Sequence, residues 1–389
     1  MAKVRLGDIA TVVTKGTTPT TIGFQFEDSG INFVKIESIS EDGTFLKEKF
    51  SHISNECNVQ MRRSQLQEND ILFSIAGAIG RSVIVTKEIL PANTNQALAI
   101  IRVPKGKIDY NYLLYALSSS AINQQATQHQ QGVAQLNISL KNVSDFLLPI
   151  YTEAMQKRIV QNLKKIDKLV FLRKQQLAKL DELVKARFVE MFGDPVNNPM
   201  NYPKSQLGKV CDVRDGTHDS PEYYDVGYPL VTSKNVTGGK IDLSECNLIS
   251  EDDYKKICER SKVDRGDIIM PMIGTVGKPV IVNAEPMFAI KNVALIKFTP
   301  DSLVTNIYIE TLLESDYFDR AVLDKIRGGT QKFIALGDIR KLEIILPDLK
   351  HQQCFSAFVE RVDKQKQTVQ QSLEKLELMK KALMQEYFG

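Results

Sequence analysis

The chain has 389 residues, 43% of them hydrophobic, and its 50 Lys and Arg against 47 Asp and Glu leave a net charge of +3. It has no run of eighteen apolar residues and no signal peptide, so we expect a cytoplasmic protein of two or three domains without a membrane span. The five scattered cysteines include no C-x-x-C pair, which argues against a disulfide framework and a zinc site. A charge this small gives no sign of nucleic-acid binding, so a DNA-binding face would need basic groups clustered in space.

Residues 1–150 predict a mixed α+β domain, the first head. Short apolar or alternating runs bounded by Gly, Pro and Asn predict strands at 31–39, 70–75, 82–86 and 97–103. Residues 110–128 predict a helix.

Residues 151–193 predict one long amphipathic helix. Apolar residues recur at steps of three and four, which is typical of a coiled-coil seam. They are Ile159, Leu163, Ile166, Val170, Leu177, Leu180 and Val184. Some forty residues give a helix of roughly 60 Å. Gly193-Asp194-Pro195 ends it and opens a linker at 194–204.

The rest of the chain repeats this order. Asp70 and Asp267, and likewise Gly80 and Gly277, are 197 residues apart. Residues 205–347 predict a second head, with strands at 229–236, 267–272, 279–282 and 293–298 and a helix at 306–325. Residues 348–389 predict a second long helix, whose seam is Val359, Val362, Val369, Leu373, Leu376 and Leu383. This period is a domain, far longer than a solenoid repeat.

The predicted fold is α+β, with two tandem mixed α/β heads separated by two long helices that form an antiparallel coiled coil. Each helix is too long to be covered by a head of about 150 residues, whose radius of gyration is about 15 Å. The alternative is that each stripe is buried against its own head.

The sequence offers no catalytic or cofactor motif. There is no G-x-x-x-x-G-K-[ST] phosphate loop, no G-x-G-x-x-G cradle and no Asn-Pro-Pro-Tyr or Asp-Pro-Pro-Tyr segment of adenine methyltransferases. His52, His129, His218 and His351 lie far from one another in the sequence and from the cysteines. We therefore predict no catalytic residue, no metal site and no cofactor in this chain.

Residues suited to contacting DNA lie in paired loops of the two heads. Glycine-flanked turns let backbone approach a phosphate, and amide side chains can bond base edges. In the first head the candidates are Lys15, Thr17, Thr18, Lys35, Gly77, Gly80, Arg81, Asn95, Gln96 and Gln135. In the second they are Thr217, His218, Lys234, Asn235, Gly274, Gly277, Lys278, Asn292, Arg327, Gln331 and Lys332. Ordinary turn chemistry is the alternative for each one singly.

The ordered duplication resembles the DNA-specificity subunit of a Type I restriction-modification system over essentially the whole chain. The motifs are Leu6-Gly7-Asp8-Ile9 and Leu207-Gly208-Lys209-Val210 at the openings, Asp70-Ile71 and Asp267-Ile268 before the glycine turns, Leu148-Pro149 and Leu346-Pro347 at the junctions, and Phe192-Gly193 and Phe388-Gly389 at the helix ends.

The resemblance implies that each head is a target-recognition domain reading one half of an interrupted double-stranded DNA site. The helices would set the spacing and dock two methyltransferase subunits through their seams. S-adenosylmethionine, ATP and Mg would bind to partner subunits, including motor-nuclease restriction subunits.

Two other functions stay open from the residues alone. One is a protein-binding scaffold with a dimerising coiled coil. The other is a methyltransferase whose motifs occur in an unrecognised order.

Overall fold

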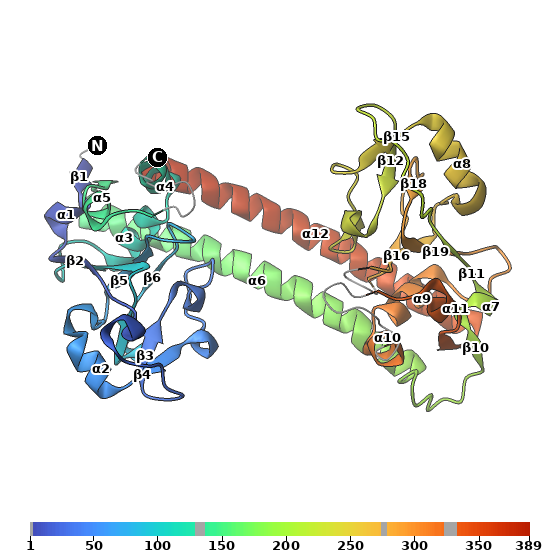
Figure 1. Ribbon diagram of the computed structural model, residues 1–389, viewed down its shortest axis with the longest axis horizontal. Helices are drawn as coiled ribbons and strands as arrows, with labels where there is room; N and C mark the ends of the chain where they lie inside the picture. Colours follow the sequence, from blue (N-terminus) through green and yellow to red (C-terminus); the bar gives the residue numbers. More distant parts are fainter. Residues whose placement is uncertain (1–2, 129–136, 274–277, 323–332) are drawn as a thin grey trace. The chain divides into compact units, whose positions relative to one another are not determined.

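The computed structural model describes residues 3–128, 137–273, 278–322 and 333–389 (Figure 1). The chain divides into two compact units, one of residues 1–174 with 371–389 and the other of residues 175–370. Both long helices contribute to both units. Among the described residues, no helix is long and apolar enough to span a membrane.

Unit 1 is built on three small sheets. A four-stranded antiparallel sheet has the order β2-β8-β5-β6, a three-stranded sheet has the order β4-β3-β7, and β1 pairs with β9. The strands are β1 Lys3–Arg5, β2 Val12–Lys15, β3 Ile31–Val34, β4 Ser51–Ile53, β5 Ile71–Ser74, β6 Ser82–Ile84, β7 Ala92–Thr94, β8 Leu98–Arg102 and β9 Leu147–Pro149. The helices are α1 Leu6–Ile9, α2 Asn55–Gln60, α3 Tyr110–Leu117, α4 Ser120–Gln128, α5 Leu140–Ser144 and the start of α6 Glu153–Phe192.

Unit 2 has the same topology. Its sheets have the orders β11-β19-β16-β17, β15-β12-β18 and β10-β20, with a small added hairpin β13-β14. The strands are β10 Lys204–Gln206, β11 Asp212–Asp215, β12 Tyr228–Val231, β13 Val236–Thr237, β14 Lys240–Ile241, β15 Asn247–Ile249, β16 Ile268–Pro271, β17 Val280–Ile281, β18 Ala289–Ile290, β19 Val293–Lys297 and β20 Glu343–Ile345. The helices are α7 Leu207–Val210, α8 Glu251–Ser261, α9 Asn306–Leu313, α10 Asp316–Val322, α11 Leu336–Arg340 and the start of α12 Leu349–Phe388.

The predicted strands are present, except that those predicted at 31–39 and 229–236 end early: β3 ends at Val34 and β12 at Val231, and short 3-10 helices follow at Ile36–Ser38 and Ser233–Asn235. Two predicted helices are each two helices. The 110–128 segment breaks at Ser118-Ser119, and the 306–325 segment breaks at Glu314-Ser315. The Ser118 hydroxyl donates to the Leu114 carbonyl at 2.9 Å, and the Ser315 hydroxyl donates to the Leu312 carbonyl at 2.6 Å. Serine competes for nearby backbone groups in this way, so it favours helix ends over helix interiors.

A buried acidic residue anchors the central strand of the larger sheet in each unit. In unit 1, Asp70 accepts two hydrogen bonds of 2.7 Å from Arg102 on β8. In unit 2, Lys297 on β19 donates to Asp267 at 2.6 Å. Each carboxylate also accepts a backbone N–H from three residues earlier. These acids therefore hold strand β5 against β8, and β16 against β19, in the fold.

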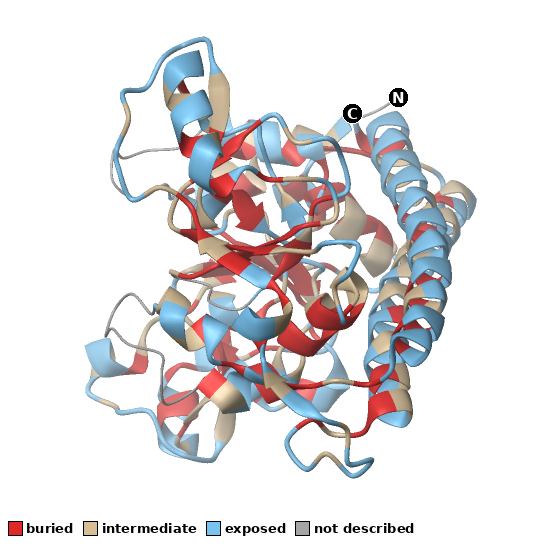
Figure 2. Ribbon diagram, turned by 90° about the vertical axis from the view of Figure 1, so that its right-hand side faces the viewer, coloured by how far each residue is buried: buried red, intermediate tan, exposed pale blue. Residues whose placement is uncertain are grey.

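The long helices run antiparallel within each unit, as the sequence predicted. In unit 1, Lys380 pairs with Asp167 at 2.6 Å, and Arg173 donates to Ser372. In unit 2, Lys366 pairs with Asp181 at 2.6 Å. Every seam residue named above is buried or half-buried, whereas most of the remaining helix surface is exposed (Figure 2). The middle of the seam packs helix against helix through Leu180, Val362 and Val369, whereas Ile159 and Leu163 belong to the core of unit 1 and Val359 to the core of unit 2.

A buried glutamine joins each head to the helix that follows it. Gln156 on α6 accepts the Asp109 N–H and donates to the Tyr151 carbonyl. Gln352 on α12 accepts the Thr305 N–H at 2.9 Å in the same way. Because Asp109 and Thr305 cap the head helices α3 and α9, each glutamine fixes a head helix to its long helix.

Aromatic residues complete the attachment at the far end of each long helix. Phe188 and Phe192 of α6 pack on Tyr308 in unit 2, with ring centroids 5.6 and 5.1 Å away. Phe388 of α12 packs on Tyr112 in unit 1 at 5.3 Å. Each head core therefore contains the end of one long helix and the start of the other.

Candidate nucleic-acid interface

In the first head, two of the predicted loops meet. The turn after β2 crosses the turn between β7 and β8, and the Gly16 N–H bonds the Asn95 carbonyl at 3.1 Å. A Cβ at Gly16 would lie 1.7 Å from the Thr94 carbonyl oxygen, so only glycine fits this crossing. Thr18 donates from its hydroxyl to Gln96 Oε1 at 2.7 Å. The structure thus brings Thr17, Thr18, Asn95 and Gln96 together.

The second head repeats the crossing with different side chains. The Thr217 N–H bonds the Ile290 carbonyl, and the Asn292 N–H bonds the Thr217 carbonyl. A Cβ at Gly216 would lie 2.4 Å from the Ile290 carbonyl oxygen. Here the side-chain pair is His218 Nδ1 with Asn292 Oδ1, 2.8 Å apart. A common backbone junction therefore carries Thr18 and Gln96 in one head and His218 and Asn292 in the other.

His218 is held from both sides of its ring. Nε2 lies 2.8 Å from Asp215 Oδ2, and Arg260 on α8 binds the other oxygen of the same carboxylate. The hydrogen bonds to Asn292 and to Asp215 raise the pKa of His218 above its usual 6.5. The His218 side chain is 62% exposed, whereas that of Asp215 is 11% exposed. The imidazole of His218 is therefore exposed at the surface, and the Asp215 carboxylate that it contacts is largely buried.

The remaining predicted residues of the first head lie apart from this junction or are already engaged. Arg81 donates to the Ile39 carbonyl at 2.8 Å, and Lys35 Nζ lies 4.2 Å from the centroid of the Phe26 ring. Gly77 and Gly80 have positive φ in the β5–β6 turn. Lys15, the last residue of β2, is half-buried. The predicted contact at Gln135 lies outside the described residues.

In the second head, one predicted contact is placed for a different role. The Asn235 side chain is buried, and its Oδ1 accepts the N–H and the hydroxyl of Thr232. It closes a turn, so its oxygen is not presented to a ligand. Lys234 and Lys278 are exposed. Gly274, Gly277, Arg327, Gln331 and Lys332 lie outside the described residues.

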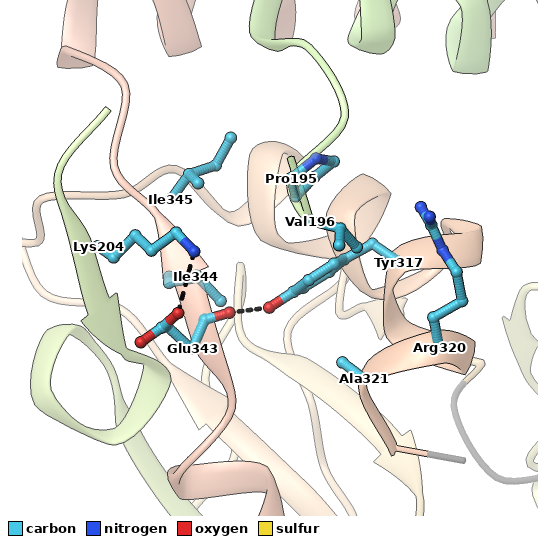
Figure 3. Close-up of a pocket in the computed structure, with 9 residues that line it drawn as sticks. All are labelled: Pro195, Val196, Lys204, Tyr317, Arg320, Ala321, Glu343, Ile344 and Ile345. Carbon is cyan, nitrogen blue, oxygen red and sulfur yellow. Dashed lines mark hydrogen bonds and ion pairs between the residues drawn. The ribbon is translucent and has the colours of Figure 1, made fainter. Parts of the chain in front are cut away.

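Two hollows in unit 2 are candidate ligand sites. One, of about 260 Å³, lies between the linker and α10 (Figure 3). Its polar groups bond one another, since Lys204 lies 3.1 Å from Glu343 and the Tyr317 hydroxyl donates to the Glu343 carbonyl. The other, of about 240 Å³, opens beside His218 and Asn292, with Met272, Ile273 and Phe333 among its lining residues. The second hollow therefore belongs to the loop junction.

The described residues contain no group of three His, Cys, Asp or Glu placed to hold a metal ion. Burial raises the pKa of the Glu310 carboxyl on α9 to about 7. Its Oε1 accepts the Ile281 N–H at 3.0 Å, which gives it a structural partner. A carboxyl with a perturbed pKa is a candidate catalytic group. Glu310 has a structural role, because its hydrogen bond to the Ile281 N–H holds strand β17.

The profile of one protein family matches the chain twice. The family is described as the Type I restriction modification DNA specificity domain, and it matches residues 1–182 and residues 199–378. The chain belongs to this family. Each match covers one head and much of the long helix that follows it, which confirms the resemblance drawn from the motifs.

Individual relatives agree with this assignment. The chain is 23% identical to the Type I restriction enzyme MjaVIII specificity subunit of Methanocaldococcus jannaschii, over 98% of this chain and 90% of that one. It is 32% identical to the EcoBI specificity subunit of Escherichia coli over 35% of this chain and 28% of that one.

Solved structures show the same fold over the whole chain. A chain from a structure entitled "Structural basis underlying complex assembly and conformational transition of the type I R-M system" has a TM-score of 0.61 at 17% identity, covering 100% of this chain and 97% of that one. The S subunit of a Type I restriction-modification system from M. genitalium has a TM-score of 0.54 at 13% identity, covering 100% and 96%. The predicted fold class is confirmed.

Asp215 and Arg260 belong to the loop junction of the second head, and neither was among the predicted DNA contacts. Asp215 is the last residue of β11, and Lys15 is the last residue of the corresponding strand β2 in the first head. Aligning the two heads therefore shows a reversal of charge at this position. Arg260 is 45 residues further along the chain, and no local pattern links it to Asp215.

Proposed function

We propose that this chain is the non-catalytic DNA-reading subunit of a Type I restriction-modification complex. Each head reads one half of an interrupted double-stranded site, and the paired helices set the distance between the halves. The observation that carries this proposal is the tandem family match, one per head, together with the same loop junction in both heads. One backbone with two different side-chain pairs fits two related but different half-sites.

The methyltransferase and nuclease activities are assigned to partner subunits. S-adenosylmethionine would bind to two methyltransferase subunits and ATP to the motor-nuclease restriction subunits, with Mg likewise bound on a partner subunit. The complex would work in the cytoplasm. Two methyltransferase copies follow from the two equivalent head-and-helix repeats.

We propose that partner subunits dock beside the seam residues that the sequence suggested for docking. The seam residues named for docking are buried or half-buried in the helix pair, so a partner cannot reach most of their surface. Exposed apolar residues on the same helices are better suited, because burying them on a partner removes apolar area from water. These are Leu169, Phe171, Leu172, Leu183, Val189, Leu378 and Met379.

Methylation mapping tests the function. The chain is expressed with its methyltransferase partner, and methylated adenines are mapped across the host genome. A second strain carries a chimera in which residues 205–347 come from an unrelated specificity subunit. We expect a two-part motif in which only one half changes. Absence of a motif, or a motif indifferent to the exchange, would favour the protein-binding scaffold instead.

Binding to duplex DNA by the assembled complex gives an independent test. Neutralising phosphates with Lys and Arg releases counterions, so the affinity for DNA should fall steeply with salt. A scaffold that binds only proteins would show no such binding.

A further inference from the structure

The His218–Asn292 pair differs from its counterpart in the first head in one chemical respect. Thr18 contributes a hydroxyl to Gln96, and a hydroxyl can donate or accept without changing charge. An imidazole has two ring nitrogens whose roles depend on protonation. Of these two side-chain pairs, the His218–Asn292 pair is the one that contains a titrating group.

Asp215 determines which tautomer the neutral ring adopts. A carboxylate only accepts hydrogen bonds, so Nε2, 2.8 Å from Asp215 Oδ2, must carry a proton in both forms. In the imidazolium, Nδ1 also carries a proton and donates to Asn292 Oδ1 at 2.8 Å. In the neutral ring, Nδ1 has a lone pair and can only accept. Asn292 then has to turn its amide and present Nδ2 to the ring.

The turn of the amide exchanges what Asn292 shows to solvent. With Oδ1 on the ring, the NH2 group faces outward as a donor. With Nδ2 on the ring, the carbonyl oxygen faces outward as an acceptor. Asn292 is only half-buried and stands next to the exposed His218, so the outward group is accessible.

We propose that protonation of His218 sets the orientation of the Asn292 amide, and thereby which base edge the second head prefers at one position of its half-site. The proposal rests on the proposed DNA-reading function. In the charged state the donor suits a base acceptor, such as guanine N7 and O6 or thymine O4. In the neutral state the acceptor suits adenine N6 or cytosine N4.

Charged groups of both signs surround His218. Asp215 on β11 stabilises the imidazolium, and Arg260 on α8 opposes it. Lys291, the neighbour of Asn292, is turned to Ser220, with 2.7 Å between Nζ and Oγ. Arg214 donates to the Arg260 carbonyl at 2.9 Å and pairs with Asp212. In the first head, the described contact of the Thr18 hydroxyl with Gln96 joins two uncharged groups, so it should not respond to pH.

The test selects DNA from a pool of randomised duplexes at pH 6.0 and at pH 8.5, at one salt concentration. It uses the full chain assembled with its methyltransferase subunits. We expect both selections to return a two-part motif that differs at one position, in the half-site assigned to the second head. A duplex carrying the pH 6.0 base should bind roughly five- to tenfold more weakly at pH 8.5, as expected for one lost hydrogen bond to a base.

Two variants identify the titrating group. His218→Gln does not titrate and has one donor end and one acceptor end: its NH2 meets Asp215 and its carbonyl oxygen accepts from Asn292, as in the neutral ring, so it should hold the pH 8.5 preference at both pH values. Thr18→Val is the matched change in the first head. It should weaken recognition of the other half-site equally at both pH values.

The possible failures are distinguishable. Two-part motifs that are identical at both pH values would overturn the inference and leave the proposed function standing. So would a pH-dependent preference that persists in His218→Gln, since another group, such as Glu310, would then be responsible. If neither selection enriches a motif, the proposed function itself fails, and the inference fails with it. The comparison of the unaltered chain at two pH values needs no variant to fold.

Discussion

Replacing Glu310 by Gln should stabilise unit 2 at alkaline pH and have little effect at acid pH. Burial raises the pKa of this carboxyl from 4.5 to about 7, with Glu314 and Asp363 adding to the increase and Lys366 opposing it. Glutamine keeps an oxygen that can accept the Ile281 N–H and has no charge to desolvate.

The direction in which stability changes with pH follows from the number of protons bound to the folded and the unfolded chain. Below pH 4.5 the carboxyl is protonated in the folded and the unfolded chain. Between pH 4.5 and about 7 the folded chain keeps a proton that the unfolded chain has lost, so stability falls as the pH rises. Above about pH 7 both states are ionised, and the folded state carries the full cost of a buried charge.

The size of the stability change follows from the difference between the pKa of Glu310 in the unfolded and in the folded chain. At about 1.4 kcal/mol for each tenfold change, the gap from 4.5 to about 7 corresponds to about 3 kcal/mol at pH 8. At pH 5 the same calculation leaves about 1 kcal/mol. Glu310 keeps some surface exposure, and solvent screening makes these values upper bounds.

The assay is thermal unfolding of the full chain and its Glu310→Gln variant at pH 5 and pH 8. A change of about 3 kcal/mol raises Tm by at most roughly 6–12 °C in a unit of this size, and the gain should shrink markedly at pH 5. Glu245→Gln, at an exposed position, controls for loss of a surface charge. A gain equal at the two pH values, or none at pH 8, would refute the assignment of a buried, costly carboxylate.

Three further changes test the fold and the docking surface. Asp70→Ala leaves Arg102 without its buried partner, and denaturant unfolding should show unit 1 destabilised by about 3 kcal/mol; an unchanged midpoint would contradict the anchoring role. Gly16→Ala should abolish recognition of one half-site in methylation mapping and cost more than about 1 kcal/mol in stability, whereas Gly337→Ala, which meets no atom within 4 Å, should do neither. Phe171→Ser combined with Leu378→Ser should weaken methyltransferase co-purification at least tenfold, since exposed apolar anchors dominate interfaces; full retention would exclude this helix surface.

The repeat, the strands and the seam could be predicted because they depend on local periodicity. The spacing of Ile159, Leu163 and Ile166 places them on one face of the helix, independently of how the head folds. Topology could be expected to repeat once Asp70 and Asp267 were aligned. The strand order itself was not predictable, because the parallel pairing of β3 with β7 joins segments separated by three other strands.

The loop junction was only half predictable. Glycine and threonine after the opening strand mark a tight turn, which placed Thr17, Thr18 and Thr217 correctly among loop residues. That the turn crosses the loop at Asn95 depends on the register of β2 with β8, which no local pattern gives. The turn-closing contact of Asn235 was not predictable for a similar reason, since an amide that caps a turn and an amide free to bind a base have the same sequence signal.

The duplication also explains why recognition could diverge without loss of the fold. In both heads the acid before the central strand, the glutamine on the long helix and the glycine at the crossing have kept their structural roles, and each is buried. The positions that differ, Thr18 against His218 and Lys15 against Asp215, lie at the end of the opening strand and in the loop after it. Changes there alter the groups offered to a ligand and leave the buried frame intact. Half-site preference can therefore change in one head while the other head, the helix seam and the exposed helix surface stay as they are.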